Sequence, residues 1–307
     1  MDEILVIDIG GTKTNVSFVT SSDLKIKVLS SSTFSTCSNP DLEIQKISSL
    51  YSEKSKKISS MSLSLPGLWD KNGVLLESFN LKTWIGYPFI KNLSNALNIK
   101  DYTWETDVVC GALGEYHAQS GTCPTKGEAR SPRFAGEAGQ GQHSMSLLYL
   151  NLGTGIGAAF IKDGKPFKSN SKLTLRMQKL LFSDQDELVS AIDLISGSSI
   201  LKGTPYNSVE QLFTDYKAGK IESFEIVSKS QIQLASWLIN LFYLFAPDIM
   251  ILNGGLTYDW EVLCEEAIDI ANEELKDQVK ILPSKLKDMA PVYGAYLNHK
   301  TAVSCKP

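Results

Sequence analysis

The chain has 307 residues, of which 43% are hydrophobic, so it can bury a sizeable core as one large or two medium domains. Its formal net charge of −4 is spread without long charged blocks, which argues against nucleic acid or a membrane surface as a partner. The five cysteines are scattered and contain no Cys-x-x-Cys pair, so we expect neither a disulfide framework nor a structural zinc site.

Two features of the sequence indicate a cytoplasmic protein. The acidic pair Asp2-Glu3 precedes the first strand, where a secretory signal would carry basic residues. The longest apolar stretch, Trp237 to Leu252, is broken at Pro247-Asp248. This stretch predicts a buried helix followed by a strand rather than a membrane span.

The first motif lies between two predicted strands, Ile4 to Ile9 and Asn15 to Val19. The stretch between them predicts a tight hairpin whose glycines allow close approach of the backbone. Successive N–H groups form an anion-binding concavity, and threonine and lysine side chains add donors. Asp8, at the end of the first strand, is expected to face Mg²⁺ through water. The residues expected to contact phosphate are Gly10, Gly11, Thr12, Lys13 and Thr14. The alternative is an ordinary turn that binds no ligand.

Further elements of the first half follow from local patterns. A third strand, Lys25 to Phe34, completes an antiparallel meander. Asn39-Pro40 predicts a helix start, with Asn as N-cap and Pro at the first helical position. The strand Ile58 to Leu65 ends in Pro66-Gly67, which is either a plain turn or a place where the backbone approaches a ligand.

A carboxylate stands where a short strand, Trp104 to Asp107, meets a helix predicted over Val108 to His117. Such an Asp is either an N-cap or the general base of a phosphoryl transfer. The following segment, Ala118 to Ser144, is rich in Gly, Ser, Gln and Ala and shows no apolar period. It is predicted to be a surface loop.

A second glycine-rich turn lies within Leu148 to Ile161, which reads strand, turn, strand. Its candidate phosphate-binding residues are Gly153, Thr154, Gly155 and Gly157. The spacing is not that of a P-loop. Because a strand rather than a helix follows the turn, a dinucleotide-binding fold is also disfavoured.

The second half is predicted to be mostly helical after a tight turn at Lys162 to Lys165. Its strongest helix is Ser223 to Phe245, whose apolar stripe belongs in a core. A strand over Asp248 to Leu252 leads into Asn253-Gly254-Gly255 and a helix over Trp260 to Leu275. This double glycine is either a plain turn or a surface for adenine and ribose. The last helix, about Ala290 to Lys300, carries small residues for close packing on the first lobe.

Two phosphate hairpins in this order resemble the nucleotide-binding architecture of actin, the heat-shock ATPases and the sugar kinases. The motifs are most similar to those of the ROK-type sugar kinases, which include bacterial glucokinases and N-acetylmannosamine kinases. The resemblance implies an α/β, two-lobed actin-like ATPase (ribonuclease H-like) fold. A lobe of residues 1–116 with 290–307 and a lobe of 117–289 would close on ATP and Mg²⁺. The matching stretches are Asp8 to Thr14, Leu63 to Gly67, Asn80 to Trp84, Trp104 to Asp107 with Ala112 to Tyr116, Leu152 to Gly157 and Ile249 to Gly255.

The same resemblance implies an ATP-dependent carbohydrate kinase with Asp107 as base. It assigns Gly254 and Gly255 to the adenosine site, and Gly67, Asn80 and Thr106 to the sugar site. Thr106 stands where the family carries Asn. Many ROK proteins also carry a cysteine-rich zinc motif that this chain lacks, and many are homodimers.

The family places a Glu-x-x-His pair beyond the second hairpin to bind ring hydroxyls. Here Arg176 and Lys179 fall near those positions, within the stretch Leu173 to Lys179. Two cationic donors would suit a sugar acid such as 2-keto-3-deoxygluconate. The alternative is an amphipathic helix whose Arg and Lys face water.

Other activities stay open at this stage. A glucokinase or N-acetylmannosamine kinase is one alternative, and a non-catalytic sugar sensor is another. ROK repressors carry an N-terminal helix-turn-helix, for which the hairpin at Asp8 leaves no room.

Overall fold

The computed structural model describes residues 3–22, 25–53, 58–120, 145–168, 175–184 and 186–304. They belong to two compact units. The first is Met1–Phe134 with Met289–Pro307, and the second is Ala135–Asp288. Each unit combines a mixed five-stranded sheet with helices, as the α/β class requires.

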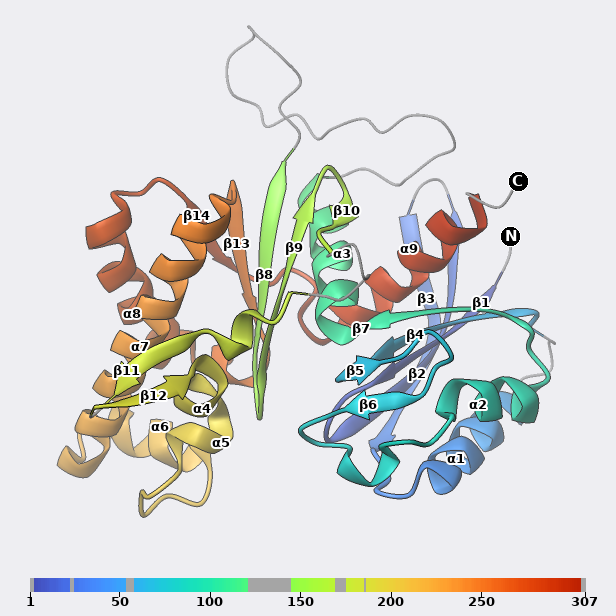
Figure 1. The fold of residues 1–307 in the computed structure, drawn as a ribbon, viewed down its shortest axis with the longest axis horizontal. Coiled ribbons are helices and arrows are strands. Elements are labelled where there is room, and N and C mark those ends of the chain that lie inside the picture. The colour runs from blue at the N-terminus through green and yellow to red at the C-terminus, as the bar shows by residue number, and fades with distance from the viewer. Residues whose placement is uncertain are drawn as a thin grey trace, which may run out of the picture. The chain divides into compact units, whose positions relative to one another are not determined.

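The first unit is built on a sheet with the strand order β3-β2-β1-β4-β7 (Figure 1). The predicted meander is confirmed, because β1 (Ile4–Ile9), β2 (Lys13–Ser22) and β3 (Lys25–Ser35) pair antiparallel. Next to β1, the strands β4 (Ser60–Leu65) and β7 (Asp101–Thr106) add in parallel. The carboxyl ends of β1, β4 and β7 therefore lie at one edge of the sheet.

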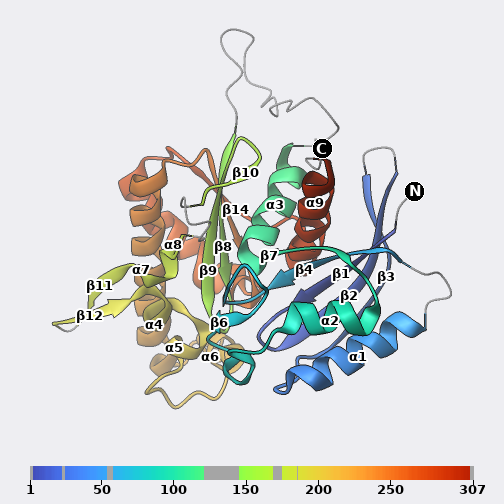
Figure 2. The same cartoon turned by 45° about the vertical axis from the view of Figure 1, so that its right-hand side comes forward.

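Helices cover both faces of this sheet (Figure 2). On one face lie α1 (Pro40–Ser52) and α2 (Phe89–Leu97); the predicted N-cap is confirmed, since Asn39 accepts the N–H of Asp41 at 2.8 Å. On the other face lie α3 (Asp107–Ser120) and α9 (Ala290–Ser304). Short elements over the α1 and α2 face are β5 (Leu68–Trp69), β6 (Leu75–Glu77) and η1 (Lys82–Trp84).

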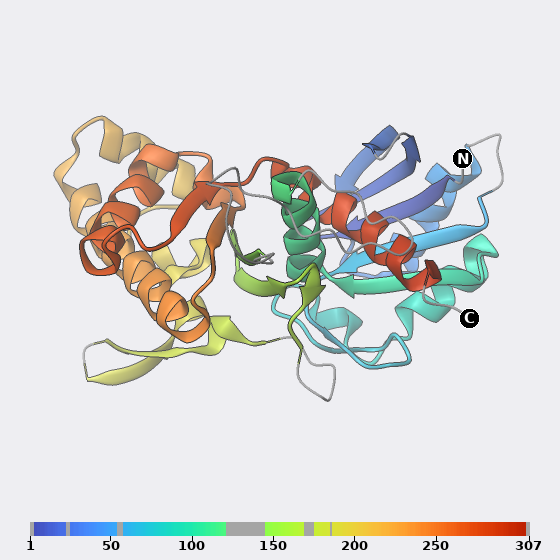
Figure 3. The ribbon, with the colours of Figure 1, turned by 90° about the horizontal axis from the view of Figure 1, so that it is seen from above.

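The two helices α3 and α9 pack at backbone distance (Figure 3). A Cβ on Gly294 would lie 1.6 Å from the carbonyl oxygen of Cys110, and one on Gly114 would lie 2.3 Å from that of Ala290. The predicted close packing of small residues in the last helix is confirmed. Because this packing extends α3 to Ser120, the surface loop predicted from residue 118 is wrong at residues 118–120; its remainder, 121–144, lies outside the described residues.

The second unit repeats the topology of the first, with the strand order β10-β9-β8-β13-β14. A two-residue turn joins β9 to β10, with Asp163 at φ 55° and Gly164 at φ 71°, which confirms the predicted tight turn. Beside β8, the strands β13 and β14 add in parallel. The strands are β8 (Ser146–Leu152), β9 (Ile156–Lys162), β10 (Lys165–Pro166), β13 (Ile249–Asn253) and β14 (Lys280–Pro283).

The core of the second unit lies between its sheet and the helices α7 (Ile221–Phe245) and α8 (Trp260–Leu275). The helix and strand expected within Trp237 to Leu252 are confirmed as the end of α7 and the start of β13. No helix among the described residues is long and apolar enough to cross a bilayer. The remaining short helices are α4 (Ala191–Ile195), α5 (Gly197–Ile200), α6 (Val209–Lys217), η3 (Gly255–Thr257) and η4 (Lys287–Met289).

The amphipathic helix expected around Leu173 to Lys179 is absent from its described part, which starts at residue 175. A single 3₁₀ turn, η2 (Met177–Lys179), leads instead into a hairpin of β11 (Leu181–Asp184) and β12 (Glu187–Ser190). Only Met177 is buried in this stretch, and its carbonyl accepts the indole N–H of Trp237 at 3.3 Å. One anchored residue does not provide the apolar stripe that an α-helix needs.

Candidate functional site

A row of polar side chains crosses the first sheet where its parallel strands end. Asp8 on β1 is paired with Ser64 on β4, and Ser64 is paired with Glu105 on β7. The Ser64 hydroxyl donates to Asp8 Oδ1 at 2.6 Å, and Glu105 is buried. Ligands of open α/β sheets bind beyond the carboxyl ends of the strands, so this edge is the candidate site of the first unit.

This row also fits the expected magnesium ion. Two carboxylates and a hydroxyl supply hard oxygen donors, and Mg²⁺ uses one or two carboxylates while keeping waters and phosphate oxygens. Within the described ranges, no three His, Cys, Asp or Glu side chains gather into a complete metal-binding cluster.

Asp107 stands at the same edge, as the first residue of α3. Its Oδ1 accepts the backbone N–H of Val108 at 2.8 Å. Burial raises the pKa of Asp107 from 3.8 to about 6, and the backbone N–H groups of Val108 and Asp107 lower it less. A carboxylate with this pKa is ionised at neutral pH and still basic enough to accept a hydroxyl proton.

Cys110, a buried cysteine one turn into α3, lies near three carboxylates of this edge. Burial raises the pKa of Cys110 well above 9.0, and the negative charges of Glu105, Asp8 and Asp107 raise it further. The three carboxylates thus act on one place, beside the beginning of α3.

The predicted phosphate hairpin has the expected tight turn. The N–H of Gly10 donates to the carbonyl of Lys13 at 2.8 Å, and Thr12 and Lys13 are exposed. A Cβ on Gly11 would lie 2.1 Å from Nδ2 of Asn80, so the Asn80 side chain lies directly on the hairpin backbone. Gly11, predicted to bind phosphate, and Asn80, predicted to bind sugar, are therefore in contact.

Thr14 has a structural part that the sequence did not reveal. Its side chain is fully buried, and its hydroxyl donates to Oε1 of Glu43 at 2.5 Å and adjoins that of Thr36 at 3.0 Å. These bonds tie the hairpin to α1. The Thr14 hydroxyl is therefore engaged within the first unit, and its phosphate contact stays a prediction.

Gly67 and Thr106, both predicted for the sugar site, differ in whether the fold alone explains the residue. Gly67 has φ +91°, and its Cβ would lie 2.3 Å from the carbonyl of Glu77, so the turn alone accounts for glycine there. Thr106, beside Asp107, has a buried hydroxyl oxygen with no hydrogen-bond partner in the described part of the chain. Its donor and acceptor capacity is available to a ligand.

In the second unit, the two predicted nucleotide turns lie side by side at the ends of β8 and β13. Asn151, two residues before Gly153, is paired with Asn253, which directly precedes Gly254. Gly254 has φ +100°, and its Cβ would lie 2.3 Å from the carbonyl of Leu152. Nothing lies within 4 Å of a Cβ on Gly255, so packing does not require that glycine.

The Gly153-Thr154-Gly155 turn is held in shape by the chain around it. Gly153 N–H donates to the Gly155 carbonyl at 2.9 Å, and the Ser198 hydroxyl donates to the Thr154 carbonyl at 2.9 Å. Cβ atoms on Gly153 and Gly155 would make only ordinary contacts, at 3.7 and 3.8 Å. Gly157 lies within β9, paired with Asn151.

Arg176 and Lys179 are exposed on either side of the buried Met177. They precede and end one 3₁₀ turn, in which side chains three positions apart lie on the same side. Their assignment to the sugar site, which came from the positions of the family's Glu-x-x-His pair, stays a prediction.

Sequence reasoning missed Ser64 and Glu105 as site residues. The signal was present in β4, where serines alternate with the buried Met61, Leu63 and Leu65. That alternation marks one face of the strand as polar. It could not show that Asp8 and Glu105 stand on either side of it.

One family model matches the part of the chain that forms the first sheet. The model of the ROK family matches residues 4–126. The expected resemblance to ROK proteins is confirmed.

Proteins similar to this chain carry more than one kind of name. An uncharacterized protein of Clostridium perfringens is 28% identical over 96% of this chain and 97% of its own length. A beta-glucoside kinase of Listeria innocua is 22% identical, over 95% of this chain and 96% of its length. A xylose repressor of Caldicellulosiruptor bescii is 23% identical, over 78% of this chain and 62% of its length.

Solved ROK structures share the fold. A Streptococcus pneumoniae ROK protein in complex with sucrose superposes with a TM-score of 0.76 at 20% identity, over 98% of this chain and 99% of that one. A ROK hexokinase from Thermus thermophilus gives 0.76 at 19% identity, over 99% and 100% of the two chains. The actin-like ATPase fold expected from the sequence is confirmed.

Proposed function

We propose that the protein is an ATP-dependent carbohydrate kinase that transfers the γ-phosphoryl group of ATP to a sugar hydroxyl. The observation that carries this proposal is Asp107, whose carboxylate has a pKa of about 6 and stands at the same sheet edge as the glycine hairpin. The ROK match and the beta-glucoside kinase relative support it.

In this proposal each unit carries residues that bind the nucleotide. The backbone of Gly10 and Gly11, with the exposed Thr12 and Lys13, would bind phosphate oxygens in the first unit. The Gly153 to Gly155 turn and Gly255 would bind the nucleotide in the second. Mg²⁺, held through water at Asp8, would neutralise charge on the phosphates.

Asp107 would accept the proton of the sugar hydroxyl as its oxygen attacks the γ-phosphorus. The new oxygen–phosphorus bond forms while the bond between the γ-phosphorus and its bridging oxygen breaks, which leaves ADP. Thr106, whose hydroxyl is buried without a partner in the described chain, and Asn80 would orient the sugar.

The order of candidate acceptors rests on the relatives. The sugar-acid hypothesis depended on aligning Arg176 and Lys179 with the family's Glu-x-x-His pair, whereas one similar protein is named a beta-glucoside kinase. We therefore place neutral hexoses and hexosides first. A sugar acid such as 2-keto-3-deoxygluconate tests the alternative, an acceptor site lined by Arg176 and Lys179.

The experiment is ADP release with ATP and Mg²⁺ over a panel of glucose, a β-glucoside, N-acetylglucosamine, N-acetylmannosamine, gluconate and 2-keto-3-deoxygluconate. We expect turnover on a neutral sugar, reduced about 10²-fold or more in Asp107→Asn. Turnover on the acids alone would restore the cationic site. Absence of turnover on every sugar would reject the kinase.

The xylose repressor relative favours one second candidate, a sugar sensor without catalysis. A sensor would bind a sugar of the panel with equal affinity in the parent protein and in Asp107→Asn, and neither would release ADP. Calorimetric titration of the same sugars into both proteins separates the two functions.

A further inference from the structure

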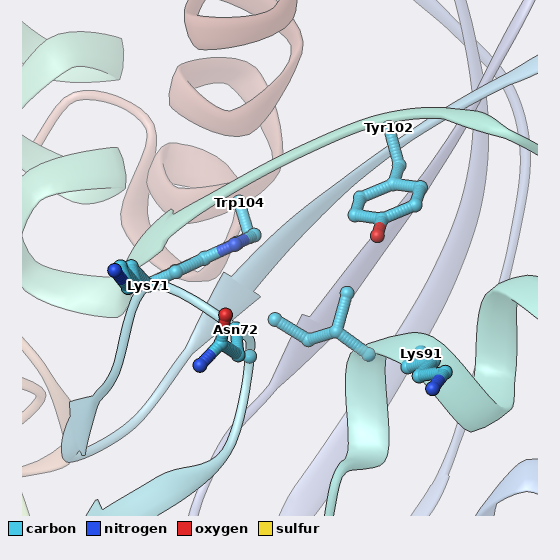
Figure 4. Close-up of a pocket in the computed structure, with 7 residues that line it drawn as sticks. Lys71, Asn72, Lys91, Tyr102 and Trp104 are labelled. Carbon is cyan, nitrogen blue, oxygen red and sulfur yellow. The ribbon is translucent and has the colours of Figure 1, made fainter.

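A pocket of about 390 Å³ lies in the first unit, on the α2 side of the edge strand β7. Figure 4 shows its lining side chains, which come from three elements. Lys71 and Asn72 belong to the turn between β5 and β6, Lys91 to α2, and Tyr102 and Trp104 to β7. None of the residues proposed above for catalysis or for nucleotide binding lines it.

The turn that forms one wall is rigidly built. Asp70 accepts the N–H groups of Asn72 at 2.8 Å and of Val74 at 2.9 Å, so its carboxylate closes the turn on itself. Gly73 has φ +75°, and a Cβ there would lie 2.8 Å from Cβ of Ile90 on α2. The backbone of the turn thus lies on the Ile90 side chain of α2, and the wall is formed before any ligand binds.

Two aromatic rings form the opposite wall. Tyr102 and Trp104 are two residues apart on β7, so they point to the same face of the sheet. In Figure 4 both rings project toward the turn and α2. Tyr102 is 37% exposed, so its ring is open to a ligand. Aromatic rings of this kind combine an apolar face with a polar tip and suit the amphipathic face of a sugar ring.

The charge at this pocket is positive. Lys71 and Lys91 line it from two sides, and no aspartate or glutamate is among its lining residues. The nearby Asp70 carboxylate accepts hydrogen bonds from its own turn, which lower its pKa, and the Lys71 ammonium lowers that pKa further, so Asp70 offsets part of the Lys71 charge. Ammonium groups form their strongest hydrogen bonds with anionic oxygens, so the lysines favour a phosphate or a carboxylate.

We infer that this pocket binds an anionic carbohydrate, with the sugar ring against Tyr102 and Trp104 and its anionic group between Lys71 and Lys91. The inference rests on the proposed function and deepens it. A sugar kinase makes a sugar phosphate, which is the first anionic carbohydrate that the pocket would meet. Asp107 does not line the pocket; it begins α3, three positions after Trp104 of β7.

Calorimetric titration of the full chain without ATP tests the assignment. The ligands are a hexose 6-phosphate, a hexuronate, the neutral hexose and inorganic phosphate at constant ionic strength. We expect the two anionic sugars to bind, and Lys71→Ala with Lys91→Ala to weaken them about tenfold per lysine, because a hydrogen bond to a charged group contributes a factor of this size. The relative strength of phosphate and carboxylate ligands identifies the anionic group.

The matched control is Lys25→Ala with Lys27→Ala, which removes two exposed lysines from β3 at the opposite edge of the same sheet. Binding that falls equally in both double variants, or in neither, would overturn the inference. Tyr102→Ala should weaken the sugar phosphate and leave inorganic phosphate unchanged. Equal binding of the sugar phosphate and inorganic phosphate in the parent protein would refute the aromatic wall.

The titration needs neither ATP nor turnover, so it remains decisive when the kinase assay fails. In an active protein, the double variant at Lys71 and Lys91 should leave KM for the neutral sugar unchanged. A rise of that KM would instead make the pocket part of the acceptor site and contradict its separation from Asp107.

Discussion

The side chain of Asn80 lies on the backbone of Gly11, where a Cβ would come within 2.1 Å of Nδ2 and 2.8 Å of Cβ of the asparagine. The whole asparagine side chain, and not only its tip, occupies the space that any larger residue would need. A glycine predicted for phosphate and an asparagine predicted for sugar thus depend on each other.

The first prediction concerns this pair. Gly11→Ala should lower the free energy of unfolding by about 1–3 kcal/mol, because Asn80 must move. In an Asn80→Gly background, which also removes the Cβ at 2.8 Å, the same change should cost much less. Urea unfolding of the four proteins in a double-mutant cycle measures the coupling. A coupling energy near zero would show that another contact excludes alanine.

The second prediction concerns activity and pH. Because Asp107 must be ionised to accept a proton and its pKa is about 6, kcat/KM for the sugar should fall about tenfold per pH unit below pH 6. Initial rates at saturating MgATP between pH 5 and 8 measure this. A profile that stays level down to pH 5 would exclude a base with this pKa.

The third prediction concerns the stability of the same residue. The folded state holds the Asp107 proton more tightly than the unfolded chain, since its pKa rises from 3.8 to about 6. Its ionisation therefore destabilises the fold by about 3 kcal/mol above pH 6, and by nothing below pH 3.8. The free energy of unfolding of Asp107→Asn, relative to that of the parent protein, should therefore rise by about 3 kcal/mol from pH 4 to pH 7. Denaturant unfolding at both pH values gives the comparison, and a constant difference would contradict it.

The fourth prediction uses two adjacent glycines as a matched pair. Gly254→Ala should cost about 2 kcal/mol or more, because its φ of +100° and the Leu152 carbonyl at 2.3 Å both oppose a Cβ. Gly255→Ala should fold normally and weaken ATP binding, because its Cβ position is open. Thermal unfolding and ATP titration separate the effects. The proposed role of Gly255 fails where its alanine variant binds ATP like the parent protein.

The fifth prediction concerns the helix that positions Asp107. In Gly294→Ala the new Cβ would meet the Cys110 carbonyl at 1.6 Å, so α9 must move away from α3 at a cost of about 3 kcal/mol or more. Thr301→Ala, at an exposed position of α9, is the control and should change stability by about 0.5 kcal/mol or less. Equal melting temperatures for the two variants would contradict the contact.

Much of the fold was accessible from local patterns. Strand alternation marked the meander of the first unit, the Asn39-Pro40 pair marked the start of α1, and apolar periodicity marked α7 to within two residues. These signals are local, because each depends on residues within one turn or one strand. Local patterns did not predict the 3₁₀ turn that ends at Lys179. Its position depends on a contact with a distant helix, in which the buried Met177 accepts the indole N–H of Trp237.

The sequence by itself determined the two glycine hairpins, the helix with Asp107 at its start and the order of elements that resembles the ROK family. Only the tertiary structure decided which residues meet there. The Ser64 hydroxyl reaches Asp8 across 56 positions of the chain, and Thr14 is turned to Glu43 across 29. Such contacts follow from the pairing of parallel strands and the packing of a distant helix, and no short-range pattern in the chain records that pairing.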